Sequence, residues 1–379
     1  CFVSQHVRGI CSCVVAVKPT VAMGNSCKTI PSGAVVSAVS VGSPATGSAD
    51  LQTAASLSGP TGKVTREHLM PILEVKKAQV AHPTGDPSFA VMQPFPAGIR
   101  AEDADPFLMC DEFGPKVSEG PKPPGGWHGH LGMDIMTYLV KGRGAHADSL
   151  GNQVVFDSPG FQWMSVGSGI EHAEGGHAPR GEVGHGFQIW INVPKARKLD
   201  DPRYGTEVPS SIPTLTFVGG IARLLAGEAQ GRQGPFKTTQ PVQMVDIELD
   251  AGASITHVLP AELDNCMIYV YRGRGAIVGK DISAQQVVRL DASKKEIRAV
   301  SMEAGSEGVA ALLFAGKRIG EPIAWHGPFV MNTQAELRKA FKEYQLGIFP
   351  PKRVAWDYRK AKWNPTTASP AVSSAAEGA

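Results

Sequence analysis

Short apolar runs recur through the middle of the chain, with glycine, proline, aspartate or asparagine between them. They lie at 72–80, 107–110, 135–140, 154–156 and 187–191. Runs of this length bounded by turn residues are typical of β-strands. Strands at such intervals favour a sandwich or a barrel, so the pattern predicts an all-β protein.

Helical periodicity is convincing only near the end of the chain, from Thr333 to Tyr344. Thr333 is a candidate N-cap, and Glu336 follows three residues later, which is the spacing of a capping box. After Pro350 and Pro351 the sequence turns basic and polar. We therefore expect a short C-terminal helix, followed by a mostly disordered tail over 350–379.

Composition supports the β interpretation and excludes some functions. The 379 residues leave room for two domains, and the 43 glycines and 29 prolines suit a protein with many turns. A net charge of +2 gives no reason to expect nucleic acid as a partner. No stretch is long and apolar enough to span a membrane. Cys110 and Cys266 stand alone in apolar runs, so we expect buried free thiols.

The first 70 residues differ in composition from the rest. Up to residue 65 they are rich in small residues and carry one acidic residue, Asp50. An acid-poor, serine-rich start is typical of an organelle transit segment, and a disordered low-complexity leader is the equal alternative. A weaker hypothesis has Met23 as the start, with Gly24 myristoylated and Cys27 palmitoylated, although Lys28 departs from that motif.

An internal repeat predicts two copies of one β-domain. Residues 134–145 and 265–276 match at a constant offset, and each segment contains a Gly-Arg-Gly turn. At the same offset His128 corresponds to Leu259, and His130 corresponds to Ala261. The second copy therefore keeps the strand without the histidines. This favours a chemical role for the histidines in the first copy, with one metal ion per chain.

Four residues carry the candidate chemistry. His128 and His130 are spaced i, i+2, and so are His172 and Glu174. Side chains two apart on a strand share a face, so two facing strands could present three imidazoles and a carboxylate to one point. Such a donor set suits iron, copper, nickel, manganese or zinc better than magnesium or calcium.

The region from about Ile72 to Pro350 resembles the pirin family of the cupin superfamily. The similarity rests on Asp-Pro-Phe-Leu-Met-Cys-Asp-Glu-Phe (105–113), Trp-His-Gly-His (127–130), the run from Gln162 to Glu174, Gly-Phe-Gln-Ile-Trp-Ile-Asn (186–192) and His-Gly-Pro-Phe-Val-Met-Asn-Thr (326–333).

The resemblance implies two tandem cupin β-barrels closed by a C-terminal helix. We expect a leader over 1–70, an N-terminal cupin domain with the metal site over 71–205 and a degenerate cupin domain without metal over 206–349. Carried over by position, the metal ligands are His128, His130, His172 and Glu174, and the metal is Fe²⁺.

The resemblance also implies two alternative functions. The first is an iron-dependent dioxygenase that cleaves flavonols such as quercetin with dioxygen. In it Glu174 would be catalytic and take the flavonol proton if it leaves the metal; in the alternative it stays a plain ligand. The second is a redox-sensing nuclear co-regulator that binds a transcription factor without catalysis. We expect a monomer in the cytoplasm or nucleus, or in an organelle if the leader is a transit segment.

The chain departs from the family pattern beside the first histidine pair. The family commonly reads His-Pro-His-Arg-Gly, and this chain has Gly129 and Leu131 at the second and fourth positions. Glycine should loosen the strand. Leucine removes a cation that we expected near the mouth of the metal site, which weakens the co-regulator hypothesis. Asp134 stands where many cupins carry a ligating glutamate, but its shorter reach makes Glu174 the better fourth ligand.

Overall fold

The computed structural model describes residues 55–56, 64–83, 89–293 and 298–369, all within the unit Asp50–Ala379. The expected leader therefore lies largely outside the described residues, as do the transit and acylation hypotheses. No helix among the described residues is both long and apolar enough to cross a membrane.

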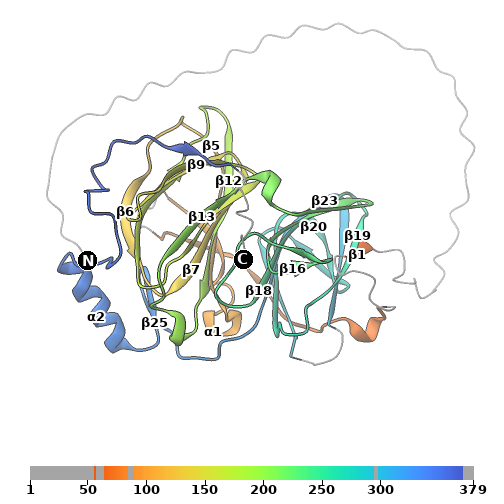
Figure 1. Cartoon of the computed structure of the whole chain (residues 1–379). Coiled ribbons are helices and arrows are strands. Elements are labelled where there is room, and N and C mark those ends of the chain that lie inside the picture. The colour runs from red at the N-terminus through yellow and green to blue at the C-terminus, as the bar shows by residue number, and fades with distance from the viewer. Residues whose placement is uncertain (1–54, 57–63, 84–88, 294–297, 370–379) are drawn as a thin grey trace, which may run out of the picture. The chain divides into compact units, whose positions relative to one another are not determined.

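The N-terminal half of this unit forms two sheets that face each other (Figure 1). Apolar side chains from both sheets meet in one buried cluster. The seven-stranded sheet runs in the order β13 (Arg203–Glu207), β10 (Gly160–Ser165), β7 (Met133–Lys141), β12 (Val183–Asn192), β5 (Phe107–Val117), β4 (Val91–Phe95), β3 (Gln79–Ala81). The five-stranded sheet runs β26 (Thr366–Thr367), β9 (Gln153–Asp157), β8 (Arg143–Asp148), β11 (Ile170–Gly176), β6 (Gly125–His130).

The C-terminal half is built on one ten-stranded sheet, most of whose strands are green to light blue in Figure 1. Its main path is β14 (Thr214–Phe217), β15 (Gly220–Ala226), β18 (Val242–Leu249), β23 (Ala299–Gly316), β20 (Asn265–Ile277), β22 (Gln286–Leu290), β2 (Ile72–Lys77). Strands β1 (Ala55–Ser56), β19 (Ser254–Val258) and β21 (Lys280–Ser283) pair off this path. A hairpin of β16 (Glu228–Ala229) and β17 (Arg232–Gln233) stands beside it.

Short helices connect these strands. They are α1 (Ala101–Ala104) and three 3-10 turns, η2 (Arg66–His68), η3 (Lys195–Arg197) and η4 (Pro209–Ser211). Strands therefore dominate both halves, and the expected all-β class with a short C-terminal helix is confirmed.

The two halves exchange elements. The strand expected over 72–80 is split, and β2 pairs with β22 of the C-terminal sheet, while β3 pairs with β4 of the N-terminal sheet. Residues 72–77, which the sequence led us to assign to the N-terminal domain, thus extend the sheet of the other one. A shared apolar core joins the halves, and inside it the Tyr138 hydroxyl donates to Asp246 at 2.6 Å.

The end of the chain returns to the N-terminal half. Strands β24 (Ala324–His326) and β25 (Phe329–Met331) form a hairpin, and α2 (Gln334–Gln345) follows. The predicted capping box is present, because the Thr333 hydroxyl accepts from the Glu336 amide and the Glu336 carboxylate accepts from the Thr333 amide. Helix α2 packs through Leu337 into a buried cluster that also contains Leu131.

Residues 350–369, which we expected to be part of a mostly disordered tail, lie along the five-stranded sheet. Strand β26 pairs in parallel with β9, where it is drawn in blue (Figure 1). The Val354 amide donates to the Ser149 carbonyl at 2.9 Å, and the Asn364 amide donates to the Gln153 side chain at 2.7 Å. This segment therefore continues the N-terminal fold.

Candidate metal centre

Two antiparallel strands of the five-stranded sheet bring the predicted histidines together. Strand β6 carries His128 and His130, and β11 carries His172, with His172 directly opposite His128 and Ile170 opposite His130. Alternation along β6 sends both of its histidines to the inner face. There the His130 ring meets Trp190 of the seven-stranded sheet edge-on, with ring centres 5.1 Å apart.

The three imidazoles converge on one point. One ring nitrogen from each of His128, His130 and His172 lies within 4.8 Å of the other two. The Nε2 atoms of His128 and His172 are 3.1 Å apart. In the described part of the chain, these three residues form the only such group of three or more histidine, cysteine or acidic side chains.

Backbone carbonyls fix which nitrogen of the first two rings is free. His128 Nδ1 lies 2.7 Å from the Gly126 carbonyl, and His130 Nδ1 lies 3.3 Å from the Pro328 carbonyl. A carbonyl can only accept, so each Nδ1 carries the hydrogen and each Nε2 presents a lone pair. His130 Nε2 is buried and has no hydrogen-bond partner among the described residues. Carbonyl bonds of this kind are how proteins orient histidine ligands of metal ions.

Burial keeps two of the three imidazoles uncharged. His130 is 1 % exposed and His172 is 0 % exposed. Burial, with a further contribution from the neighbouring His128, holds the pKa of both imidazoles well below the ordinary histidine value. Neutral imidazole is the form that binds a metal ion, because the ligand needs a free lone pair. The orphaned nitrogen and the neutral rings therefore fit a bound transition metal, and the histidine triad could hold one.

Glu174 stands beside the triad and is not part of the converging group. Its Oε2 accepts from the Thr137 hydroxyl at 3.1 Å and from the Gln162 amide at 2.7 Å. Thr137 and Gln162 belong to β7 and β10, so the carboxylate spans the space between the two sheets. Oε1 has no hydrogen-bond partner among the described residues. Coordination of a metal by Glu174 stays a prediction.

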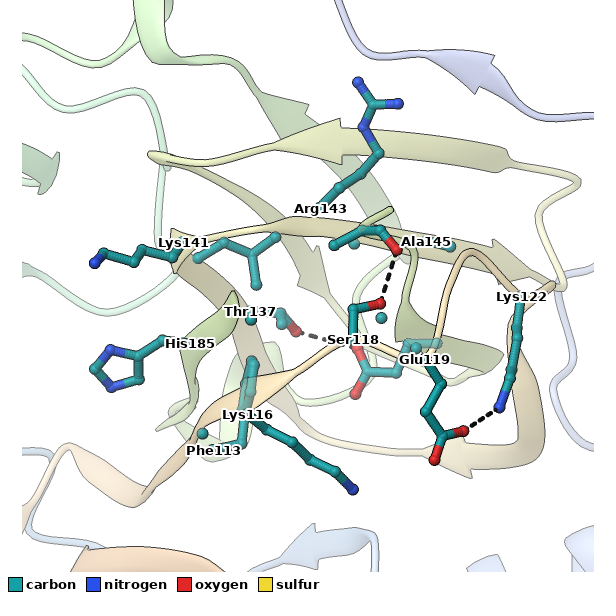
Figure 2. A pocket seen from close by; sticks show the side chains of 18 of the residues that line it. Phe113, Lys116, Ser118, Glu119, Lys122, Thr137, Lys141, Arg143, Ala145 and His185 are labelled. Atoms are coloured by element: carbon teal, nitrogen blue, oxygen red, sulfur yellow. Dashed lines mark hydrogen bonds and ion pairs between the residues drawn. The ribbon is translucent and has the colours of Figure 1, made fainter. Parts of the chain in front are cut away.

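Glu174 also lines a cavity of about 500 Å³. The three histidines do not line it, so a ligand in the cavity would meet Glu174 first. Its lining area is mostly apolar, and the charged side chains of Lys141 and Arg143 extend away from its middle (Figure 2). The apolar lining residues include Phe89, Phe113, Val117, Leu139, Phe156 and Ala178.

A fourth imidazole lies behind the triad. The ring of His146 is fully buried, stacks on Tyr204 with 4.3 Å between ring centres, and stands 5.4 Å from the ring of His172. His146 Nε2 lies 3.0 Å from a carboxylate oxygen of Asp148. The Nδ1 atoms of His146 and His172 are both buried without a partner. His146 therefore lies next to a candidate ligand.

The two substituted positions of the histidine motif alternate with the histidines and so face outward, Gly129 within β6 and Leu131 directly after its end. Leu131 is 5 % exposed and packs with Phe329 and Leu337, so our expectation that this position borders the metal mouth is wrong. The ring of Phe349 lies against Gly129, and a Cβ atom at this position would stand 2.5 Å from that ring. Glycine therefore provides room for Phe349.

Two other residues singled out from sequence lie away from the triad. The carboxylate of Asp134 accepts from the backbone and hydroxyl of Thr239, which ties it to the segment just before β18 in the C-terminal half. Burial raises the pKa of Asp134 to about 6. His185 lies on β12, and its Nε2 is 2.7 Å from the buried carboxylate of Glu112.

Comparison with known proteins agrees with this architecture. The family model described as Pirin matches residues 88–191, and the model described as Pirin C-terminal cupin domain matches residues 244–350. A Vibrio cholerae protein named "Putative quercetin 2,3-dioxygenase" is 34 % identical over 284 residues, which are 73 % of this chain and 97 % of that protein. Pirin-like protein 2 of Arabidopsis thaliana is 36 % identical over 251 residues, 64 % of this chain and 75 % of its own length.

A crystal structure of quercetin 2,3-dioxygenase from Acinetobacter baumannii superposes with a TM-score of 0.68 at 27 % identity. The match covers 74 % of this chain and 99 % of the bacterial one. The two family models fall on the two halves that the sheets define, and the histidine triad lies in the first. This chain belongs to the pirin family of the cupin superfamily.

Proposed function

We propose that this protein is an iron-dependent dioxygenase that cleaves flavonols such as quercetin. The observation that carries the proposal is the cavity of about 500 Å³ that opens on Glu174, next to three converging imidazoles. The names of the Vibrio and Acinetobacter relatives support the same activity. The bound iron would act as a Lewis acid towards a substrate hydroxyl and supply the redox chemistry that dioxygen requires.

The cavity suits a flat aromatic molecule. Its volume falls within the range usual for small-molecule sites, roughly 300–1,000 Å³. Phe113, Leu139 and Phe156 offer apolar walls for ring stacking and packing. These walls would keep water from the reacting end of the cavity and leave the few polar groups there to orient the ligand.

Glu174 is the group that would accept the proton of the substrate. Thr137 and Gln162 hold Oε2, which leaves Oε1 to accept the proton of the flavonol 3-hydroxyl. Deprotonation makes the ring electron-rich, so dioxygen can add across it. Two ring bonds then break, both oxygen atoms enter the ester product, and one ring carbon leaves as carbon monoxide. In the alternative, Glu174 stays a plain fourth ligand of the metal and takes no proton.

An aerobic assay with iron-loaded protein and quercetin tests the proposal. We expect loss of the flavonol absorbance together with release of carbon monoxide. Glu174→Gln should lower the rate at least a hundredfold, as loss of a catalytic base does. Glu119→Gln is the matched control, because Glu119 lines the same cavity but pairs with Lys122 at its exposed rim. A metal-loaded protein that leaves quercetin intact would defeat the enzyme proposal and leave the co-regulator hypothesis.

A further inference from the structure

The C-terminal segment covers the strands that carry the candidate ligands. We call residues 349–367 the C-terminal strap. The matched family model ends at residue 350, so nearly all of the strap lies beyond it. The strap is anchored at its far end by the pairing of β26 with β9 and near its start by Val354, whose amide donates to Ser149. Between these anchors it meets the outer face of β11.

The central contact is a pair of hydrogen bonds to one buried carboxylate. Glu171 directly precedes His172 and points to the opposite face of β11, where it is 1 % exposed. Its Oε2 accepts from the Tyr358 hydroxyl and from Arg359 Nη2, both at 2.6 Å. Among the described residues, no other donor reaches this carboxylate. A buried carboxylate is costly unless it is bonded and paired, so Glu171 depends on the strap.

The strap also contacts the strand of the other two histidines. The ring of Tyr358 packs on Trp127, the residue before His128, with ring centres 5.3 Å apart. The ring of Phe349 lies against Gly129, between His128 and His130, and against Gly169 at the start of β11. Every candidate histidine ligand therefore has a chain neighbour that touches the strap on the outer face.

We propose that the C-terminal strap positions the metal ligands, with Tyr358 and Arg359 acting through Glu171 to hold His172 against His128. These two residues are positioning residues, because they touch neither the ligand nitrogens nor the cavity. The inference rests on the triad as a metal site, and it does not depend on flavonol cleavage.

Tyr358 and Arg359 keep at neutral pH the hydrogens that they donate to Glu171. Burial and the bond to Glu171 raise the pKa of Tyr358 to about 12, so the phenol remains a donor at neutral pH. The bond to Glu171 also raises the pKa of Arg359. Both side chains therefore remain donors to Glu171 at neutral pH. Groups that orient metal ligands from outside the coordination sphere typically change metal affinity by about 10–100-fold.

The test measures Co²⁺ release from the full-length protein. The variants are Tyr358→Phe, which keeps the ring on Trp127 and removes the hydroxyl, Arg359→Met, and the double variant. Lys360→Met is the matched control, because Lys360 is exposed and pairs only with Asp357 within the strap. Each protein is loaded with Co²⁺ and mixed with excess chelator, and its absorption spectrum and its apoprotein unfolding in urea are recorded.

We expect the double variant to release Co²⁺ about ten times faster than the wild type, with an altered Co²⁺ absorption band, and Tyr358→Phe to fall between them. Lys360→Met should match the wild type. The proposal is overturned if Tyr358→Phe and the double variant keep the wild-type release rate and spectrum, even if their urea midpoints fall. It is also overturned if Lys360→Met accelerates release equally. Neither result depends on whether the protein cleaves quercetin.

Discussion

His172 and His128 direct their Nε2 atoms at each other across β11 and β6, at a separation of 3.1 Å. The Gly126 carbonyl holds the hydrogen of His128 on Nδ1, so His128 Nε2 is an acceptor. The hydrogen between the two rings therefore belongs to His172 Nε2. A metal ion bound at this point would take the place of that hydrogen, and a neutral His172 would then carry its hydrogen on Nδ1.

His146 is placed to accept a hydrogen bond from His172 once the hydrogen of His172 lies on Nδ1. Its Nδ1 is buried without a partner beside the ring of His172, whose Nδ1 is also buried and unpartnered, while its Nε2 faces Asp148. We expect His146→Phe, which keeps a flat ring against Tyr204, to weaken Zn²⁺ binding about tenfold, as loss of a ligand-orienting partner does. Competition titration with a chromophoric chelator measures this. An unchanged dissociation constant would show that His172 Nδ1 needs no acceptor.

Gln162 fixes the orientation of Glu174, so its loss should slow catalysis without loss of metal. Gln162→Leu removes the amide that bonds Oε2 at 2.7 Å. We expect kcat for quercetin to fall about tenfold while KM and the metal content stay near the wild-type values, because only the proton acceptor is disordered. Steady-state kinetics and metal analysis of the same preparations check this. A tenfold rise in KM with unchanged kcat would assign Gln162 to substrate binding instead.

Gly129 is required by the packing of Phe349. In Gly129→Ala the new Cβ would stand 2.5 Å from the buried Phe349 ring, so we expect a loss of about 1–3 kcal/mol in the free energy of unfolding. Gly126→Ala is not a suitable control because its φ is +73°, whereas Gly125 has open space around its Cβ position. Urea unfolding should therefore show a larger loss for Gly129→Ala than for Gly125→Ala. Equal losses would mean that Phe349 moves aside freely.

His257 should make the protein sensitive to acid independently of any metal. Burial lowers the pKa of His257 from 6.5 to about 4. Because the unfolded chain binds this proton more readily, the stability contributed by the neutral ring is present above pH 6.5 and is lost as the pH falls towards 4. The difference amounts to about 3 kcal/mol. We expect His257→Gln to unfold in urea with a flatter stability profile between pH 6.5 and 4. Parallel profiles would contradict the shifted pKa.

The local pattern of the sequence predicted the site better than it predicted which strands pair with each other. Period-two spacing placed His128, His130 and His172 on inner faces, and the capping box located helix α2. The same alternation places position 131 on the outer face, opposite to the histidines. Our expectation of a residue near the metal mouth followed the family pattern and overlooked this, and the burial of Leu131 corrects it.

Long-range pairings left no local signal. The sequence of β2 has the pattern of an ordinary edge strand. Nothing in this pattern indicates that β2 pairs with β22, which follows more than two hundred residues later. The partners of Glu174 come from two strands of the facing sheet, and Tyr358 meets Glu171 across 187 residues. Such contacts are set by how sheets pack, so no window of neighbouring residues contains them. A basic, polar segment after two prolines predicted disorder, yet its tyrosine and arginine satisfy a buried carboxylate.

The central claim is that three imidazoles hold one metal ion, and metal analysis tests it most directly. The wild-type protein and His172→Gln are purified without chelator, dialysed together against Fe²⁺ under anaerobic conditions, and analysed by mass spectrometry for bound metal. His177→Gln is the control, because that ring bonds the Lys122 carbonyl and lies outside the triad. We predict about one ion per chain in the wild type and the control and almost none in His172→Gln. Equal metal content in all three proteins would contradict the account.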